Sequence, residues 1–238
     1  MRLTLLQCHP HPQKLAAWAT RCGLTAGGDD LGYALHALLT AAFGESAPKP
    51  FRYFGDTRGL LAYTTHDPES LKLAAQIAAP EVHAVLGLDR LATRDFPLNW
   101  LSGQRLGFEL RIRPVLRTSQ GKERDVFLAA VDKHAATEEP LSREAVYAEW
   151  LHAELARGDA AAVEHLQLEG FRLSASLRKG LSSAGKRPAR RVAGPDAVFN
   201  GQLTVRDSAG FAALLSRGVG RHRAFGFGML LLRPPESC

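Results

Sequence analysis

Two hydrophobic periodicities, one typical of strands and one of helices, follow each other in the same order in both halves of this 238-residue chain. In the first half, strand patterns cover residues 1–8, 51–66 as a hairpin turning at Gly55-Asp56, and 82–91. Helical spacing covers residues 12–22, a segment running from near Asp30 to Phe43, and 69–78. The resulting order, β-α-β-β-α-β, is that of the ferredoxin-like unit.

The second half repeats this plan after residues 95–103, a linker bounded by Pro and Gly. Strand patterns cover residues 106–118, 124–132, 163–177, 197–207 and 227–232. Helical patterns cover residues 142–156, with Ser142 as candidate cap, and 206–216, with Asp207 or Ser208 as candidate cap. We therefore predict an α+β fold of two tandem ferredoxin-like (RRM-like) domains, residues 1–100 and 101–238.

The charge of the chain is unevenly distributed. The net charge is +6 at pH 7, and residues 1–100 contain as many acidic as basic residues, so the whole excess lies in the second half. Residues 171–195 carry seven basic residues and no acidic one, interleaved with Ser, Gly and Pro. This composition predicts a mobile basic loop that attracts a polyphosphate, and nucleic acid is the leading partner. A solvated surface loop without a function is the alternative.

Composition also bounds the location of the protein. No apolar run approaches the ~20 residues of a membrane span, and the first apolar stretch is too short for a secretory signal. The three cysteines, Cys8, Cys22 and Cys238, are an odd number at wide spacing, as in reduced cytosolic proteins. We expect a soluble cytoplasmic protein without a membrane partner.

A glycine-rich segment, "RGVGRHRAFGFGMLLL" (residues 217–232), joins the last predicted helix to the last strand. It is no Walker loop, because no Lys follows Gly226 or Gly228. A dinucleotide fingerprint would need a third glycine at Arg223, and a strand before the loop rather than a helix. We expect a main chain open to a bulky anion; the expected contacts are Gly218, Gly220, Arg221, His222 and Arg223. An ordinary helix C-cap and turn is the alternative.

Most of the nine histidines have no distinctive neighbours. His9 and His11 follow Cys8, but no second ligand pair appears at metal-binding spacing, so we expect no metal. His36 differs, because it follows Tyr33 by three residues on a predicted helix, and such side chains share a face. The two rings could act together in acid–base chemistry, or they could be packing residues.

Four segments together resemble a known family: "DLGYALHALLTAAFG" (30–44), "FELRIRP" (108–114), "VFNGQLTV" (198–205) and "GVGRHRAFGFGMLLLRP" (218–234). They are similar to the CRISPR repeat-processing endoribonucleases of type I-E (Cascade) systems. The resemblance implies metal-independent cleavage of precursor RNA at the base of the repeat hairpin, without a cofactor. It further implies 2′,3′-cyclic phosphate and 5′-hydroxyl ends, and retention of the enzyme on the 3′ hairpin of the guide RNA as a subunit of the interference complex.

Cleavage without a metal uses the neighbouring 2′-hydroxyl as nucleophile and needs a general acid and a base. An imidazole with an ordinary pKa of about 6.5 exchanges protons near neutrality, so His36 and Tyr33 are the candidates, with their roles left open. Relatives can place a basic or hydroxyl side chain soon after the histidine, whereas here Thr40 is the only such side chain between His36 and Ser46, and the first Lys or Arg after His36 is Lys49. Candidates for stabilising the developing charge are Lys186, Arg187, Arg190 and Arg191 in the basic loop, which is expected to grip the hairpin groove, or Arg221 and Arg223.

Three alternatives remain open from the sequence. The same fold could hold a guide-RNA hairpin without catalysis, or it could belong to a related RNA-processing subunit of a type IV CRISPR system. A generic RRM-like protein that binds single strands is weaker, because the aromatic residues Phe225 and Phe227 lie in the glycine segment and not on a middle strand.

Overall fold

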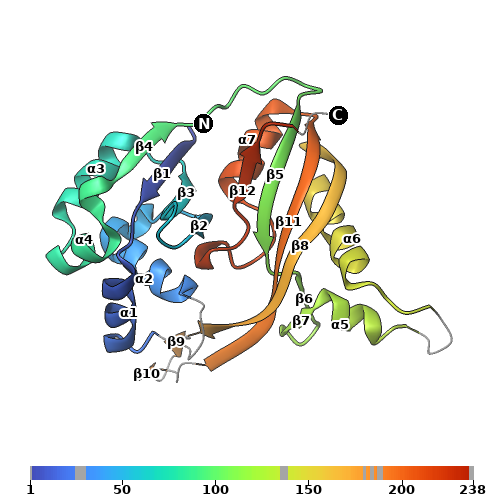
Figure 1. Ribbon diagram of the computed structural model, residues 1–238, viewed down its shortest axis with the longest axis horizontal. Helices are drawn as coiled ribbons and strands as arrows, with labels where there is room; N and C mark the ends of the chain where they lie inside the picture. Colours follow the sequence, from blue (N-terminus) through green and yellow to red (C-terminus); the bar gives the residue numbers. More distant parts are fainter. Residues whose placement is uncertain are drawn as a thin grey trace.

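The computed structural model describes most of the chain, and its described residues are 2–24, 31–134, 139–178, 181–182, 185–186 and 190–235. For residues 176–178, 181–182, 185–186 and 190–192 it describes the backbone alone. Two four-stranded antiparallel sheets lie side by side (Figure 1), with helices α1–α4 outside the first sheet and α6 outside the second. No helix among the described residues is long and apolar enough to span a membrane.

The first half forms a sheet of order β2-β3-β1-β4. Its strands are β1 (Thr4–Cys8), β2 (Phe51–Tyr53), β3 (Leu60–Thr64) and β4 (Ala92–Asp95). The helices are α1 (Pro12–Arg21), α2 (Gly32–Phe43), α3 (Pro68–Ile77) and α4 (Pro80–Leu86), with 3-10 turns η1 (Gly44–Ser46) and η2 (Leu88–Arg90). All four helices contribute buried side chains to one apolar core, which they share with the face of this sheet that they cover, as the helical and alternating periodicities predicted.

The strand predicted over residues 82–91 is wrong. Helix α4 and the 3-10 turn η2 occupy most of this segment, and the closing strand β4 follows them. Pro80 fits the first turn of α4, and Gly87, with φ of 63°, ends it in the left-handed region. Val82 and Val85 are buried three residues apart, so this apolar and β-branched segment has helical and not alternating periodicity.

The second half has the same strand order, β12-β5-β11-β8. The strands are β5 (Arg105–Ile112), β8 (Ala161–Arg178), β11 (Arg190–Val205) and β12 (Leu230–Arg233). Helices α5 (Val126–Val131), α6 (Arg143–Ala156) and α7 (Ser208–Arg217) lie between them in the chain, and η3 (Arg223–Phe225) follows α7. The predicted caps are confirmed, because Ser142 accepts a hydrogen bond from the Ala145 amide and Asp207 accepts one from the Gly210 amide.

Two predicted strands of this half are wrong in detail. The strand expected over 106–118 breaks before Pro114, and β6 (Val115–Arg117) instead pairs with β7 (Glu123–Asp125) in a separate two-stranded sheet. The strand expected over 124–132 becomes helix α5 after its first two residues. The cause is Asp125, whose carboxylate accepts a hydrogen bond from the Phe127 amide at 2.8 Å and caps the helix.

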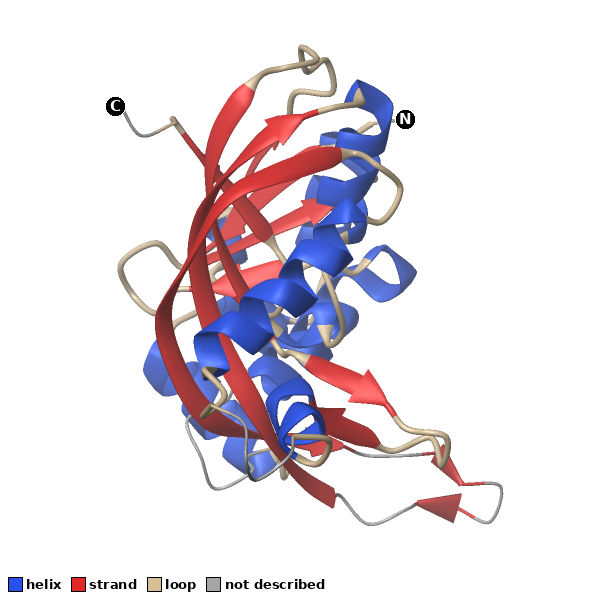
Figure 2. Ribbon diagram, turned by 90° about the vertical axis from the view of Figure 1, so that its right-hand side faces the viewer, coloured by secondary structure: helices blue, strands red, loops and turns tan. Residues whose placement is uncertain are grey.

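The prediction of a mobile basic loop over 171–195 is also wrong for its two ends. Residues 171–178 belong to β8 and residues 190–195 to β11. The two strands pair from Val205↔Ala161 out to Arg190↔Arg178, with register shifts only at 198/199 and 202/203 of β11. Figure 2 shows these two long strands curving along the molecule. Backbone pairing satisfies the peptide groups whatever the side chains are, so a polar and basic sequence is compatible with a β-ribbon.

The two halves share a core. Leu3 and Tyr63 of the first sheet are buried in the same cluster as α7 and the strands of the second sheet. The Tyr63 hydroxyl donates a hydrogen bond to the Leu230 carbonyl oxygen at 3.2 Å, and a buried bond of this kind contributes about 1 kcal/mol. The division at residue 100 into two independent domains therefore stays a prediction.

Candidate active site and nucleic-acid interface

Helix α2 carries the predicted acid–base pair. Its sequence is rich in Leu and Ala, which favour helix, and Gly44 ends it with φ of 57°. Leu35, Leu38 and Leu39 are buried in the first core. Tyr33 and His36 are half-buried, with Tyr33 packed against the margin of this core, so both residues retain access to solvent.

Tyr33 and His36 do share a face, as their spacing predicted, and a third ring joins them. Their ring centroids lie 6.4 Å apart in an edge-on arrangement. Phe225, from η3, stacks on Tyr33 at 5.8 Å and meets His36 edge-on at 5.2 Å. The glycine-rich segment therefore reaches the predicted catalytic helix and fixes the orientation of both rings.

Lys49 is the residue that sequence reasoning underrated. Burial lowers the pKa of His36 below its ordinary value, and the positive charge of Lys49 lowers it further. Lys49 is exposed, and it lines the same cavity as Phe225. The adjacent Pro50 meets the glycine-rich segment: a Cβ on Gly218 would lie 2.9 Å from Pro50 Cγ. This contact across the chain brings a cation to a histidine 13 positions away, which helical spacing does not reveal.

That cavity has a volume of about 820 Å³ and lies among β6, α6, α7 and the glycine-rich segment. Its walls carry more cations than carboxylates. The carboxylates are those of Glu123 and Glu154, and the cations are Lys49, Arg117, Arg157, Arg217, Arg221 and Arg223. The aromatic rings of Trp150 and Phe225 also line it. A polyanion with unpaired bases is chemically suited to such a surface.

The glycine-rich segment has the backbone that the sequence predicted. Gly218 and Gly220 have φ of 73° and 70°, and His222 is also left-handed, with φ of 61°. Close packing explains part of this pattern, because a Cβ on Gly218 would lie 2.8 Å from the carbonyl oxygen of Gly228. The alternative of a structural turn is thus partly realised.

The predicted cations of this segment already have partners inside the protein. Arg221 Nε donates to a carboxylate oxygen of Glu123 at 3.0 Å, and His222 Nε2 lies 2.8 Å from the other oxygen. Arg223 donates to the Arg217 carbonyl oxygen at 2.7 Å. Glu123 therefore occupies the place that a phosphate would take on Arg221 and His222.

Among the described residues, no group of three or more His, Cys, Asp or Glu side chains could hold a metal ion.

The sequence profile of the family described as CRISPR associated protein matches residues 5–234. This chain belongs to that family.

The fold of this CRISPR-associated protein recurs in solved structures. The CRISPR endoribonuclease Cse3 bound to a 19-nucleotide RNA matches with a TM-score of 0.68 and 21% identity over 98% of this chain and 100% of that one. Cas6e from Escherichia coli str. K-12 matches with 0.56 and 22%, with the same coverage. A chain of a CRISPR RNA-guided surveillance complex, pre-nicking, matches with 0.57 and 17%, again with the same coverage. No curated protein sequence matches the chain.

The basic hairpin of this CRISPR-associated protein is only partly described. Lys186 lies in β10 (Gly185–Lys186), whose backbone pairs with β9 (Leu181–Ser182). The backbones of Arg190 and Arg191 belong to β11, and Arg187 lies outside the described residues. Strand β8 contacts helix α2, so the ribbon that carries these residues starts beside the predicted catalytic helix. Their contacts with RNA stay a prediction.

Proposed function

We propose that this protein is the endoribonuclease that cuts CRISPR precursor RNA at the base of the repeat hairpin. One observation carries the proposal: Tyr33 and His36 lie together, half-buried, and both contact Phe225, which lines a cationic cavity. The fold shared with RNA-bound Cse3 supports it. A purely structural role would favour full burial of the two rings, and neither ring is fully buried.

His36 fits the base in this reaction. Its lowered pKa keeps the imidazole neutral at pH 7, and a neutral imidazole accepts the proton of the 2′-hydroxyl. The 2′ oxygen then forms a bond to phosphorus while the bond from phosphorus to the 5′ oxygen breaks. The hydroxyl of Tyr33 fits the acid that donates a proton to the leaving 5′ oxygen. The products are a 2′,3′-cyclic phosphate and a 5′-hydroxyl.

Lys49 fits the residue that stabilises the negative charge developing on the phosphorane. Its charge acts on His36, so it lies within electrostatic reach of the reacting group, and it lines the cavity where the phosphate would lie. Arg217 and Arg223 on the same cavity wall add positive charge. This assignment adds Lys49 to the more distant cations that the sequence suggested, whose role stays a prediction.

The protein would then stay on the hairpin it has cut, as a subunit of the interference complex. The β8–β11 ribbon and the glycine-rich segment would offer one stem two separate contacts, both from the second half of the chain. Membership of the CRISPR-associated family and the fold shared with a chain of a surveillance complex support this role.

The test is cleavage of the cognate repeat RNA by purified protein in EDTA. We expect one cut at the hairpin base, and none when the nucleotide preceding the cut carries a 2′-deoxy sugar. His36→Ala should abolish cleavage and retain binding. The control is His152→Ala, because His152 is an exposed imidazole on α6 that does not line the cavity. Normal cutting by His36→Ala would refute the proposal, and tight binding by wild type without cutting would favour a non-catalytic hairpin-binding subunit.

A further inference from the structure

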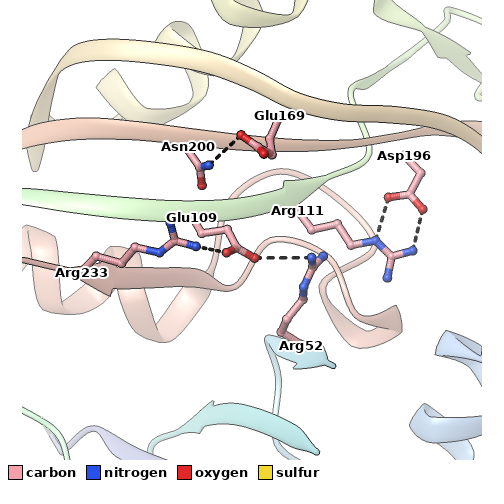
Figure 3. A network of polar contacts seen from close by, with 7 residues as sticks. All are labelled: Arg52, Glu109, Arg111, Glu169, Asp196, Asn200 and Arg233. Carbon is pink, nitrogen blue, oxygen red and sulfur yellow. Dashed lines mark hydrogen bonds and ion pairs between the residues drawn. The ribbon is translucent and has the colours of Figure 1, made fainter. Parts of the chain in front are cut away.

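A second cationic cavity lies between the two halves of the molecule. Its volume is about 400 Å³, and it is lined by residues of β2, β5, β8 and β11. The side chains that matter here are Arg52, Tyr53, Arg111 and Arg172, and we call this cavity the arginine cleft. Figure 3 shows Arg52 from the first half reaching toward Glu109 of the second half, next to Arg111 and Asp196.

Two carboxylates in and beside the cleft are each shared by two arginines. Asp196 accepts two hydrogen bonds from Arg111, at 2.7 and 2.6 Å, and one from Arg172 at 2.9 Å. Glu109 pairs with Arg52 at 3.5 Å and also with Arg233 (Figure 3). Four guanidinium groups therefore face two carboxylates among the described residues, which leaves a surplus of two positive charges.

Arg52 shows that this surplus is not compensated locally. Its Nε and Nη1 atoms are buried and have no hydrogen-bond partner within the described part of the chain. Burial lowers its pKa to about 10, and repulsion by Arg111 is the next contribution. A buried cation without its full set of partners is stabilised by a nearby anion.

Arg172 is the cation that an anion can reach. Its side chain is 55% exposed, and only its Nε bonds to Asp196, so the two terminal nitrogens have no partner among the described residues. Tyr53 of β2 is half-buried and lines the same cavity. An accessible aromatic ring beside an exposed arginine is the combination that binds unpaired nucleotides, through stacking and phosphate contacts.

The cleft continues toward the predicted catalytic helix. A smaller cavity of about 130 Å³ shares Tyr53, Arg111 and Arg172 with it and extends to Gly32 and Phe225. Phe225 contacts His36 on this side and lines the large cationic cavity on the other. A strand whose scissile linkage lies at His36 can therefore enter one cavity upstream of the cut and the other downstream.

We propose that the arginine cleft binds the backbone of the single-stranded RNA that continues beyond the cut. Arg172 contacts a phosphate there, Arg52 and Arg111 supply background charge, and Tyr53 stacks on a base. This inference rests on the proposed function, because it requires an RNA stem held on the other side of His36. It assigns to the cleft a single-stranded ligand that the hairpin-binding elements do not contact.

The test compares two RNAs, one ending at the cut and one continuing as a single strand beyond it, both with a 2′-deoxy sugar before the cut to prevent cleavage. Wild type should bind the longer RNA more tightly. Arg172→Gln should weaken binding of the longer RNA about tenfold and leave the shorter RNA unaffected. The salt dependence for the longer RNA should lose about 0.7 from its logarithmic slope, the value for one phosphate of a single strand.

Arg206→Gln is the matched control, because Arg206 is also a half-exposed arginine, 56%, paired with one aspartate, Asp159. Tyr53→Leu, which keeps the ion pairs of the cleft, should show the same selective loss if Arg172→Gln proves unstable. Equal binding of the two RNAs by wild type, or equal losses on both RNAs in Arg172→Gln, would overturn the inference. Failure of wild type to bind either RNA would instead refute the proposed function.

Discussion

Replacing Asp196 by Asn should destabilise the fold while making the arginine cleft more positive. The Asp196 side chain is 3% exposed and receives three hydrogen bonds from Arg111 and Arg172. Asn is nearly isosteric, so the change removes the negative charge and leaves the packing intact. Two arginines, one of them only 14% exposed, then lose their counter-charge.

The magnitude follows from this burial. Leaving one partner of a buried ion pair without its counter-charge costs about 3–5 kcal/mol. Melting temperatures of chains of this size change by about 2–4 °C per kcal/mol, so we expect a loss of about 10 °C. Urea unfolding followed by circular dichroism measures the free energy, and filter binding of single-stranded RNA measures the accompanying gain in affinity.

The pH dependence adds an independent check. Burial alone would raise the pKa of Asp196, but the hydrogen bonds and charges of Arg111 and Arg172 outweigh burial, so the pKa is lowered. A lowered carboxyl pKa gives stability that is complete at neutral pH and is lost as the pH falls below about 3.9 toward the folded value. Wild type should therefore lose more stability than Asp196→Asn in that range.

The control is Asp159→Asn. Its pair with Arg206 has the same 2.6 Å separation, but the Asp159 side chain is 77% exposed, and an exposed pair contributes at most about 1 kcal/mol. Asn also tolerates the left-handed φ of 49° at this position. Equal, small losses in the two variants would refute the reasoning that burial makes the Asp196 pair matter.

Two further predictions concern the active site. The cleavage rate should fall on acidification only below about pH 6.5, because burial and then the charge of Lys49 lower the pKa of His36. In Lys49→Met, single-turnover rates should be slower and the fall should occur at higher pH. An unchanged pH profile in this variant would contradict the electrostatic link between Lys49 and His36. Gly218→Ala should lose more stability and RNA affinity than Gly103→Ala. Both glycines have positive φ, which costs an alanine about 1–2 kcal/mol, but only at Gly218 would the new Cβ lie 2.8 Å from a carbonyl oxygen. Equal losses in the two variants would show that backbone strain alone matters.

Several strands could be located from the sequence because alternation of apolar and polar residues is a local signal. Residues 51–66 and 197–207 alternate over a buried sheet face, and both form strands. Two strands were predicted wrongly because a capping residue makes the apolar segment beside it helical. Gly87 ends α4 and Asp125 begins α5, and in each case the cap, more than the β-branched content, determined the local structure.

The site was predictable only where its residues are close in sequence. Tyr33 and His36 are one helical turn apart, and they meet as expected. Lys49, Phe225 and Glu123 contribute through contacts between distant segments, and no local pattern marks them. The basic ribbon was mistaken for a loop because strand pairing outside a core leaves little apolar periodicity in the sequence.

The core shared by Leu3, Tyr63 and the second sheet limits how the molecule can work. If the sheets moved freely, a cut position would have to be found anew for each bound stem. Because the Tyr63 hydroxyl is hydrogen-bonded to the Leu230 carbonyl oxygen and Phe225 contacts both Tyr33 and His36, helix α2 is held at a set distance from the second half. Under the proposed function, this fixed distance would select the phosphodiester to be cut by its position relative to the last base pair of the stem.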